Sequence, residues 1–194
     1  MPKKRRSFRR RTPFRAYRKR FVVATEGRLT EPIYFSMFNS KKSTVHVEVL
    51  KSRQRTAPGQ VLDRVKRAEI KKDDQVWLVI DRDTWEEEEL NQVFQECEQK
   101  GYTMTLSNPK FEYWLLLHFE DGNGINAENC TARLKIHLPA FTKSHVETNK
   151  LKPRINDAIE RAEQKDTSPC SDWPINTGTT VYRLVKELQN AVNG

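Results

Sequence analysis

The stretch QVWLVIDRDTWEEEELNQ, residues 75–92, decides the fold of this chain of 194 residues. Its first part, residues 75–80, is a continuous apolar run, which is typical of a strand that is covered on both faces in a parallel sheet. The run ends in two aspartates, Asp81 and Asp83, and an acidic segment with a helical pattern follows. A buried strand that stops at carboxylates and leads into a helix indicates an α/β unit with a polar site at the end of the strand.

Short runs of β character alternate with helical patterns through the first two thirds of the chain. The predicted strands lie at residues 21–25, 45–50, 75–80 and 102–106. The predicted helices lie at about 30–39, 59–71, 85–100 and from 109 onward. This alternation with buried strands predicts a doubly wound α/β fold with a mostly parallel sheet.

Polar residues that favour helix starts precede two of these helices. Thr30 is expected to cap the first helix, with Pro32 in the first turn, where its missing N–H does no harm. Ser107 and Asn108 are placed to cap the helix that follows Pro109. They could also contact a phosphate at that helix N-terminus.

The last third of the chain has a different character. Residues from about 129 to 192 have helical patterns that are broken by four prolines. We expect this part to form a helical appendage that packs on the sheet. The predicted organisation is therefore a basic arm, residues 1–20, followed by one domain, residues 21–194, with an α/β core at about 21–120.

Positive charge is concentrated at the N-terminus. The whole chain carries a net charge of +9, but residues 1–20 contain eleven Lys or Arg and no acid, which leaves −2 for residues 21–194. We interpret residues 1–20 as a disordered arm that binds nucleic-acid phosphates, with aromatic residues that can stack on bases. A tail that only aids solubility or docks a partner protein is the alternative. The predicted nucleic-acid-binding residues are Arg5, Arg6, Arg9, Arg10, Arg11, Arg15, Arg18, Lys19 and Arg20.

Other classes of protein receive little support from the sequence. No apolar run is long enough for a membrane helix, and no secretory signal is present. Cys97, Cys130 and Cys170 are odd in number and form no CxxC pair, which argues against a disulfide framework or a structural zinc site. The four histidines also lack metal-binding spacing. We expect a soluble protein of the reducing cytoplasm.

Carboxylates follow two of the predicted strands. Glu26 follows the first strand, and Asp81 and Asp83 follow the third. If these strands are neighbours, their ends lie about 4.8 Å apart, and the three carboxylates repel one another unless a cation lies between them. Carboxylate and water ligands favour Mg²⁺ or Mn²⁺. The alternative is that an aspartate only caps the next helix, a role that Thr84 could also fill.

A further acid lies in the helix after Pro109. Glu112 falls on an apolar face of that helix, where an unpaired carboxylate is costly to bury. Glu112 is therefore expected either to join the acidic site or to pair with an arginine or lysine. His118 has aromatic neighbours and is interpreted as a core histidine.

Three blocks carry a resemblance to a known family. VVATEGRLTEPIYF (22–35), WLVIDRD (77–83) and SNPKFEYWLLLHF (107–119) together resemble the RloB-like proteins, defence-associated prokaryotic members of the Toprim superfamily that are often encoded near ATPases. The resemblance implies a Toprim-like fold and Mg²⁺-dependent phosphodiester chemistry. Glu26 would match the Toprim glutamate and Asp81 with Asp83 its DxD pair, and the block around FTKSH would supply Lys143 as a site residue.

Two functions from different classes remain. The first is a metal-dependent nuclease that acts on DNA or RNA in phage defence, with the partner ATPase that the resemblance implies. The chain has no GxxxxGK[ST] motif, so any nucleotide-driven step would come from that partner. The second is a non-catalytic subunit that binds nucleic acid or a partner through the basic arm. A ribosome-associated protein is a third interpretation, but it leaves the acids unexplained.

Overall fold

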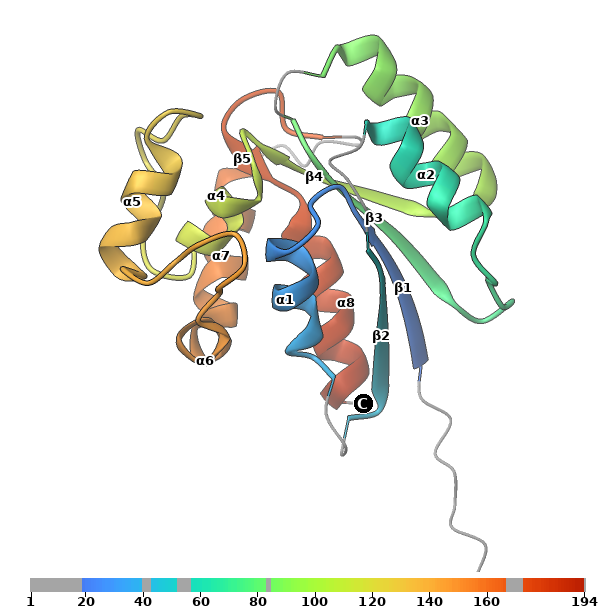
Figure 1. Ribbon diagram of the computed structural model, residues 1–194, viewed down its shortest axis with the longest axis horizontal. Coiled ribbons are helices and arrows are strands. Elements are labelled where there is room, and N and C mark those ends of the chain that lie inside the picture. Colours follow the sequence, from blue (N-terminus) through green and yellow to red (C-terminus); the bar gives the residue numbers. More distant parts are fainter. Residues whose placement is uncertain (1–18, 40–42, 52–56, 83–84, 167–172, 194) are drawn as a thin grey trace, which may run out of the picture.

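A five-stranded sheet forms the centre of the molecule (Figure 1). The computed structural model describes residues 19–39, 43–51, 57–82, 85–166 and 173–193. The strand order is β2-β1-β3-β4-β5, and all neighbours are parallel except β4 and β5. The strands are β1 (Lys19–Thr25), β2 (Val45–Leu50), β3 (Gln75–Asp81), β4 (Thr103–Asn108) and β5 (Gly178–Thr179). The prediction of an α/β fold with a mostly parallel sheet is confirmed.

Strand β3 is buried on both faces, as its apolar run predicted. Val76, Leu78 and Ile80 pack into the core beneath α2 (Pro58–Lys66) and α3 (Glu87–Lys100). The alternate residues, Trp77 and Val79, pack into the core on the opposite face. Because successive side chains of a strand point to opposite faces, both cores depend on this one strand.

The other face of the sheet is covered by helices from both halves of the chain. Figure 1 shows α1 and α8 on the side of the sheet opposite α2 and α3, with α5 and α6 farther from the strands. The elements on this side are α1 (Thr30–Ser36), α4 (Phe111–Leu116), α5 (Cys130–His137), α6 (Thr148–Leu151), η1 (Lys152–Arg154), α7 (Ile155–Lys165) and α8 (Val181–Asn193).

The order of the strands reverses between β1 and β3. From β1 the chain proceeds outward to β2, and it then returns past β1 to add β3 and β4 on the other side. In open α/β sheets, ligands bind beyond the carboxyl ends of the strands at such a reversal. The topology therefore predicts a site at the carboxyl ends of β1 and β3.

The C-terminal part packs on the sheet, as predicted, and it also adds a strand that the sequence analysis did not predict. Strand β5 pairs with β4 in antiparallel orientation, and Thr180 donates its backbone N–H to Leu106 O at 2.9 Å. Helix α8 then packs against β4 and β2. A strand of two residues is too short to show a period of two in the sequence, which is why it was missed.

The predicted helix caps are also wrong. Ser107 and Asn108 belong to β4, and the next helix begins at Phe111. Ser107 Oγ instead lies 2.8 Å from Thr179 Oγ1 in a hydrogen bond with the neighbouring strand. Thr30 Oγ1 donates to Lys143 O at 3.1 Å and does not cap α1. In each case a tertiary partner has replaced the local one.

The basic arm ends earlier than predicted. Lys19 and Arg20 are the first residues of β1. Arg20 forms ion pairs with Glu48 on β2 at 2.8 Å and with Asp74 at 2.6 Å, so its guanidinium is part of the folded domain. The other residues of the predicted arm, 1–18, lie outside the described part of the chain.

Helix α2 is shorter than the predicted 59–71. It ends at Lys66, and a turn in which Lys71 donates its N–H to Asp74 Oδ2 at 2.7 Å leads into β3. The carboxylate of Asp74 thus binds both the backbone of this turn and the guanidinium of Arg20.

Two further features are the absence of a membrane-spanning helix among the described residues and the state of the cysteines. No helix within the described residues is both long and apolar enough to cross a membrane. Cys97 and Cys130 are buried free thiols, whereas Cys170 lies outside the described residues.

The double burial of β3 makes its aliphatic side chains sensitive to truncation. Leu78→Ala removes a side chain that is 0% exposed and is expected to lower the free energy of unfolding by about 2–5 kcal/mol, because it leaves a cavity that the core cannot close. The measurement is chemical denaturation, with one m-value (the dependence of the unfolding free energy on denaturant concentration) fitted to all variants. Val192→Ala, at a 39% exposed position, is the matched control and should change stability by less than about 0.5 kcal/mol. Equal destabilisation of both variants would contradict the central role of β3.

Candidate active site

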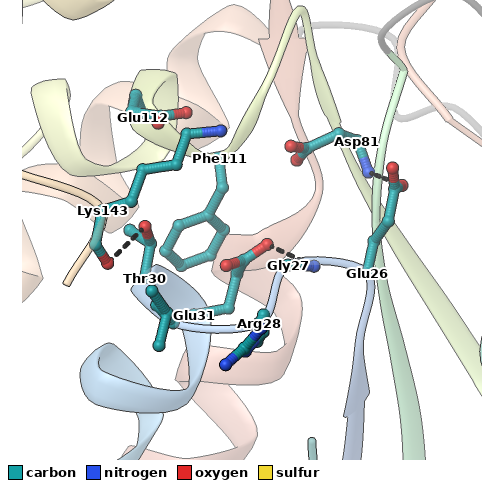
Figure 2. Close-up of a pocket in the computed structure, with 10 residues that line it drawn as sticks. Glu26, Gly27, Arg28, Thr30, Glu31, Asp81, Phe111, Glu112 and Lys143 are labelled. Atoms are coloured by element: carbon teal, nitrogen blue, oxygen red, sulfur yellow. Dashed lines mark hydrogen bonds between the residues drawn. The ribbon is translucent and has the colours of Figure 1, made fainter. Parts of the chain in front are cut away.

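A pocket of about 190 Å³ opens at the carboxyl ends of β1 and β3. It contains four carboxylates from four elements or their ends, together with one lysine (Figure 2). The charged residues that line the pocket are Glu26, Arg28, Glu31, Asp81, Glu112 and Lys143.

Glu26 follows β1 and is 2% exposed. Its Oε2 accepts the backbone N–H of Asp81 at 3.1 Å, and its Oε1 accepts the indole N–H of Trp85 at 3.3 Å. The predicted adjacency of the first and third strands is thereby confirmed, because β1 pairs with β3 up to Thr25 and Val79. The carboxylate of Glu26 ties the two strand ends together.

Arg64 of α2 lies behind this junction. It donates to Thr25 O at 2.8 Å and to Leu50 O at 2.7 Å, at the ends of β1 and β2. Burial lowers the pKa of Arg64, and the negative charge of Glu26 partly offsets that effect. A guanidinium thus supplies positive charge on the side of Glu26 that faces α2.

Asp81 is the last residue of β3, and its side chain points into the pocket. Burial raises the pKa of Asp81 well above its usual range, and the charges of Glu31, Glu26 and Glu112 raise it further, while a hydrogen bond from the Phe111 backbone acts in the opposite direction. Its Oδ1 is buried and accepts no hydrogen bond within the described residues. This oxygen is therefore available to a ligand.

Glu31 is a site residue that the sequence analysis missed. It is 4% exposed, and its Oε1 accepts the Gly27 N–H at 2.9 Å. A Cβ on Gly27 would overlap the carboxylate of Glu31, so only glycine permits this approach. Burial, with the charges of Glu112 and Glu26, raises the pKa of Glu31 to about 7. The available signal was an acid within the apolar segment of α1.

Glu112 and Lys143 line the opposite side of the pocket. Glu112 is 6% exposed on α4 and lines the pocket. Of the two expected arrangements, the structure places Glu112 with the other acids, and Lys143 lies in the same lining. Lys143 is in the loop between α5 and α6, and Figure 2 shows its ammonium group extending between Glu112 and Asp81. The bond from Thr30 to Lys143 O holds this loop against α1.

The remaining candidates are either outside the described residues or at the start of β1. Asp83 is outside the described residues, as are Arg5, Arg6, Arg9, Arg10, Arg11, Arg15 and Arg18. Lys19 and Arg20 are at the start of β1, at the end of the strand opposite the pocket.

His118 is a core residue, as predicted. It is 0% exposed; its Nδ1 donates to Trp114 O at 3.1 Å and its Nε2 accepts from Tyr34 Oη at 3.2 Å. Burial lowers the pKa of His118 to about 4. It is neutral at physiological pH and has both nitrogens paired.

The oxygen donors of the pocket suit a hard divalent cation, but the set of ligands is incomplete in the described part of the chain. Within the described residues, no three acidic, histidine or cysteine side chains are arranged to hold a metal ion. Glu26 and Asp81 are two of the three predicted ligands, and Asp83 is not described. The unpaired oxygen of Asp81 and the mutual repulsion of the carboxylates are the features that a Mg²⁺ or Mn²⁺ ion would relieve.

The fold and the site together define a class: an α/β protein whose parallel sheet carries a buried acidic pocket where its strand order reverses. A family model described as RloB-like protein matches residues 21–188. The chain therefore belongs to the RloB-like family. No curated protein and no solved structure matches it.

The raised pKa of Glu31 predicts a dependence of stability on pH. The folded protein retains a proton up to about pH 7 that an unfolded chain loses at about 4.5, so the free energy of unfolding should fall as pH rises between these values. Glu31→Gln should reduce this slope, leaving the part that comes from Asp81, and, in the absence of metal, should stabilise the protein at pH 8 by on the order of 2 kcal/mol. Denaturation at pH 4.5, 6 and 8 measures both effects. Glu98→Gln, at an exposed position of α3, is the control, and an identical pH profile in the two variants would contradict the prediction.

Proposed function

We propose that this RloB-like protein is a metal-dependent nuclease of the Toprim type, which hydrolyses phosphodiester bonds of DNA or RNA. The observation that carries the proposal is the meeting of Glu26 and Asp81 at the ends of two paired strands, in a pocket that also contains Glu31 and Glu112. Buried carboxylates that raise one another's pKa are typical of functional sites. An all-oxygen donor set favours Mg²⁺ or Mn²⁺.

The roles of the residues follow from their positions. Glu26, Asp81 and Asp83 would hold the ion, which when bound activates water and stabilises charge on the phosphate oxygens. Glu26 also fixes the end of β3 through the Asp81 N–H. Lys143 would neutralise negative charge that develops on the phosphate, since its ammonium group enters the pocket from the side opposite β3. Glu112 would orient that ammonium group.

The biological setting forms part of the same proposal. We propose that the protein acts in the prokaryotic cytoplasm in defence against phage, together with a partner ATPase. The family membership supports this setting, as does the lack of a nucleotide-binding GxxxxGK[ST] motif in the chain.

A non-catalytic binding subunit is the second candidate function. One observation favours it: within the described residues, no three potential ligands are arranged to hold a metal ion. In this case the acidic pocket would be a remnant or a structural feature, and the basic residues of the chain would carry the function.

Cleavage assays with Asp81→Asn separate the two candidates. Purified protein, alone and with a partner ATPase encoded beside it, is incubated with single-stranded DNA, double-stranded DNA and transfer RNA in Mg²⁺ or in EDTA. Cleavage is expected in Mg²⁺ only, and Asp81→Asn should lower its rate on the order of 100-fold or more while leaving nucleic-acid affinity unchanged or higher. Asp73→Asn changes an exposed aspartate and should retain full activity. No cleavage under any of these conditions would refute the nuclease.

Metal binding can be tested without activity. Mg²⁺ at about 100 times its Kd is expected to raise the free energy of unfolding of the wild type by about 2.7 kcal/mol. Asp81→Asn should lose this response and, without metal, should be more stable than the wild type above pH 7, because a buried and repelled carboxylate is gone. Equal stabilisation of Asp81→Asn and Asp73→Asn by Mg²⁺ would show that Asp81 is not a metal ligand.

The arm provides a separate prediction. Deleting residues 2–18 should weaken binding to a 20-base-pair DNA. The slope of the logarithm of the binding constant against the logarithm of salt concentration should become shallower by roughly 0.9 for each phosphate that the arm neutralises. Arg20→Gln is the control, because Arg20 pairs with Glu48 and Asp74 and should affect stability more than the salt slope. An unchanged slope after the deletion would indicate that the arm has another partner.

A further inference from the structure

The folded domain carries exposed positive charge of its own, in addition to that of residues 1–20. Residues 130–156 contain six Lys or Arg and a single acid, a net charge of +5, whereas the rest of residues 21–194 carries −7. All six basic residues are exposed. We call this surface the basic platform, and its cations are Arg133, Lys135, Lys143, Lys150, Lys152 and Arg154.

Most of these cations are not neutralised by the protein. Arg133 pairs with Glu120 at 3.1 Å, and Lys150 pairs with Glu147 at 2.8 Å. The other four form no ion pair with any described residue. An exposed cation that lacks an internal partner is available to an external anion, so the platform has three positions for phosphate groups besides Lys143, which lines the acidic pocket.

A groove between α5 and the α6–η1 turn lies within the platform. It has a volume of about 680 Å³, and its lining includes Phe119, Ile136, His137, Lys150 and Arg154 together with one acid, Asp157. The ring of His137 lies flat on that of Phe119, with centroids 5.1 Å apart and an interplanar angle of 4°. The guanidinium of Arg154 lies 5.4 Å from the centroid of Phe119.

These groups have the properties of a base-stacking site. Aromatic, imidazole and guanidinium groups offer flat surfaces on which an unpaired base can stack. The volume of the groove falls in the usual range of ligand sites, about 300–1,000 Å³. Lys150 and Arg154 are the cations in the lining of the groove, and Lys135 and Lys152 are exposed residues of the two segments that form it.

Lys143 connects the platform to the acidic pocket. It belongs to the same segment as the other five cations, yet its side chain lines the pocket beside Glu112. The Thr30 bond to Lys143 O fixes the segment against α1 at the rim of the pocket. A polyanion bound along the platform would therefore have a direct route to the carboxylates.

We infer that the basic platform binds single-stranded nucleic acid, with phosphates on its cations and one base in the groove of Phe119 and His137, and that it guides the strand toward the acidic pocket. The last step rests on the proposed function. An acidic protein would match the charges but would not use the stacked rings. Figure 1 shows α5 and α6 on the outside of the molecule, away from the β-sheet, where a nucleic-acid strand can reach them.

Binding is measured in EDTA, so that no result depends on metal or cleavage. The protein lacks residues 2–18, which removes the arm. The probes are a fluorescein-labelled 20-nucleotide single strand of mixed sequence, as DNA and as RNA, and the corresponding duplex. The platform variant carries Lys135→Gln, Lys152→Gln and Arg154→Gln. The matched control carries Lys71→Gln, Lys72→Gln and Lys100→Gln, three exposed lysines away from the platform.

The platform variant should bind the single strand roughly tenfold or more weakly at 100 mM salt, and its log-log salt slope should decrease by about 2, at roughly 0.7 for each phosphate that the platform neutralises. The control should bind as the parent does. A variant with only Lys135→Gln and Lys152→Gln should show an intermediate decrease in affinity. Because this variant keeps Arg154, its decrease cannot come from local misfolding after the loss of the Arg154 contact with Phe119. Thermal melting of each variant verifies the fold.

Other outcomes would overturn the inference. Equal affinities of the platform variant and the control would show that the platform does not bind nucleic acid. Duplex binding as tight as single-strand binding would exclude the base in the groove. Displacement of the strand by polyglutamate as readily as by unlabelled strand would indicate an acidic protein as the partner. If Asp81→Asn and Asp73→Asn do not differ in cleavage but the platform variant loses binding, the proposed nuclease activity is refuted while the inference of a nucleic-acid-binding surface is supported.

Discussion

The parallel pairing of β1 with β3 is the constraint on which the site depends. The register of this pair, from Phe21 with Gln75 to Thr25 with Val79, brings the residues after both strands to the same edge of the sheet. The carboxylate of Glu26 then accepts the N–H of Asp81. A shift of one residue in this register would turn the side chains of β3 to the opposite faces, and both hydrophobic cores would be disrupted together with the pocket.

The rest of the fold stabilises an arrangement that is unfavourable by itself. Burial raises the pKa of Asp81 and of Glu31, and the charges of neighbouring carboxylates raise both further. One oxygen of Asp81 has no hydrogen-bond partner within the described residues. Such a cluster persists only if packing elsewhere supplies the stability that it lacks, and the cores on both faces of the sheet do so. Natural proteins tend to break local rules at functional sites. The acidic pocket is one such departure within the described part of the chain.

Charge is separated along the surface in a way that suits a polyanionic substrate. Acids line a pocket at the strand ends, whereas the basic platform lies in residues 130–156, of which Lys143 lines that pocket. A substrate with many phosphates would be repelled by the pocket alone, so neighbouring cations are needed to bring it close. Lys143 belongs to both regions and is the residue where they meet.

The sequence by itself determined the α/β class, the buried central strand at 75–80, and the presence of carboxylates after two strands, because these follow from local apolar patterns and strand ends. Only the tertiary structure decided which side chains share the pocket. Glu31 reaches it because α1 turns back from the end of β1, and no period in the sequence records that direction. The side chains expected to cap helices, those of Thr30, Ser107 and Asn108, bond instead to partners distant in the chain. Strand β5 exists only through pairing with β4. Interactions between distant segments depend on how the chain is packed, and local patterns do not contain that information.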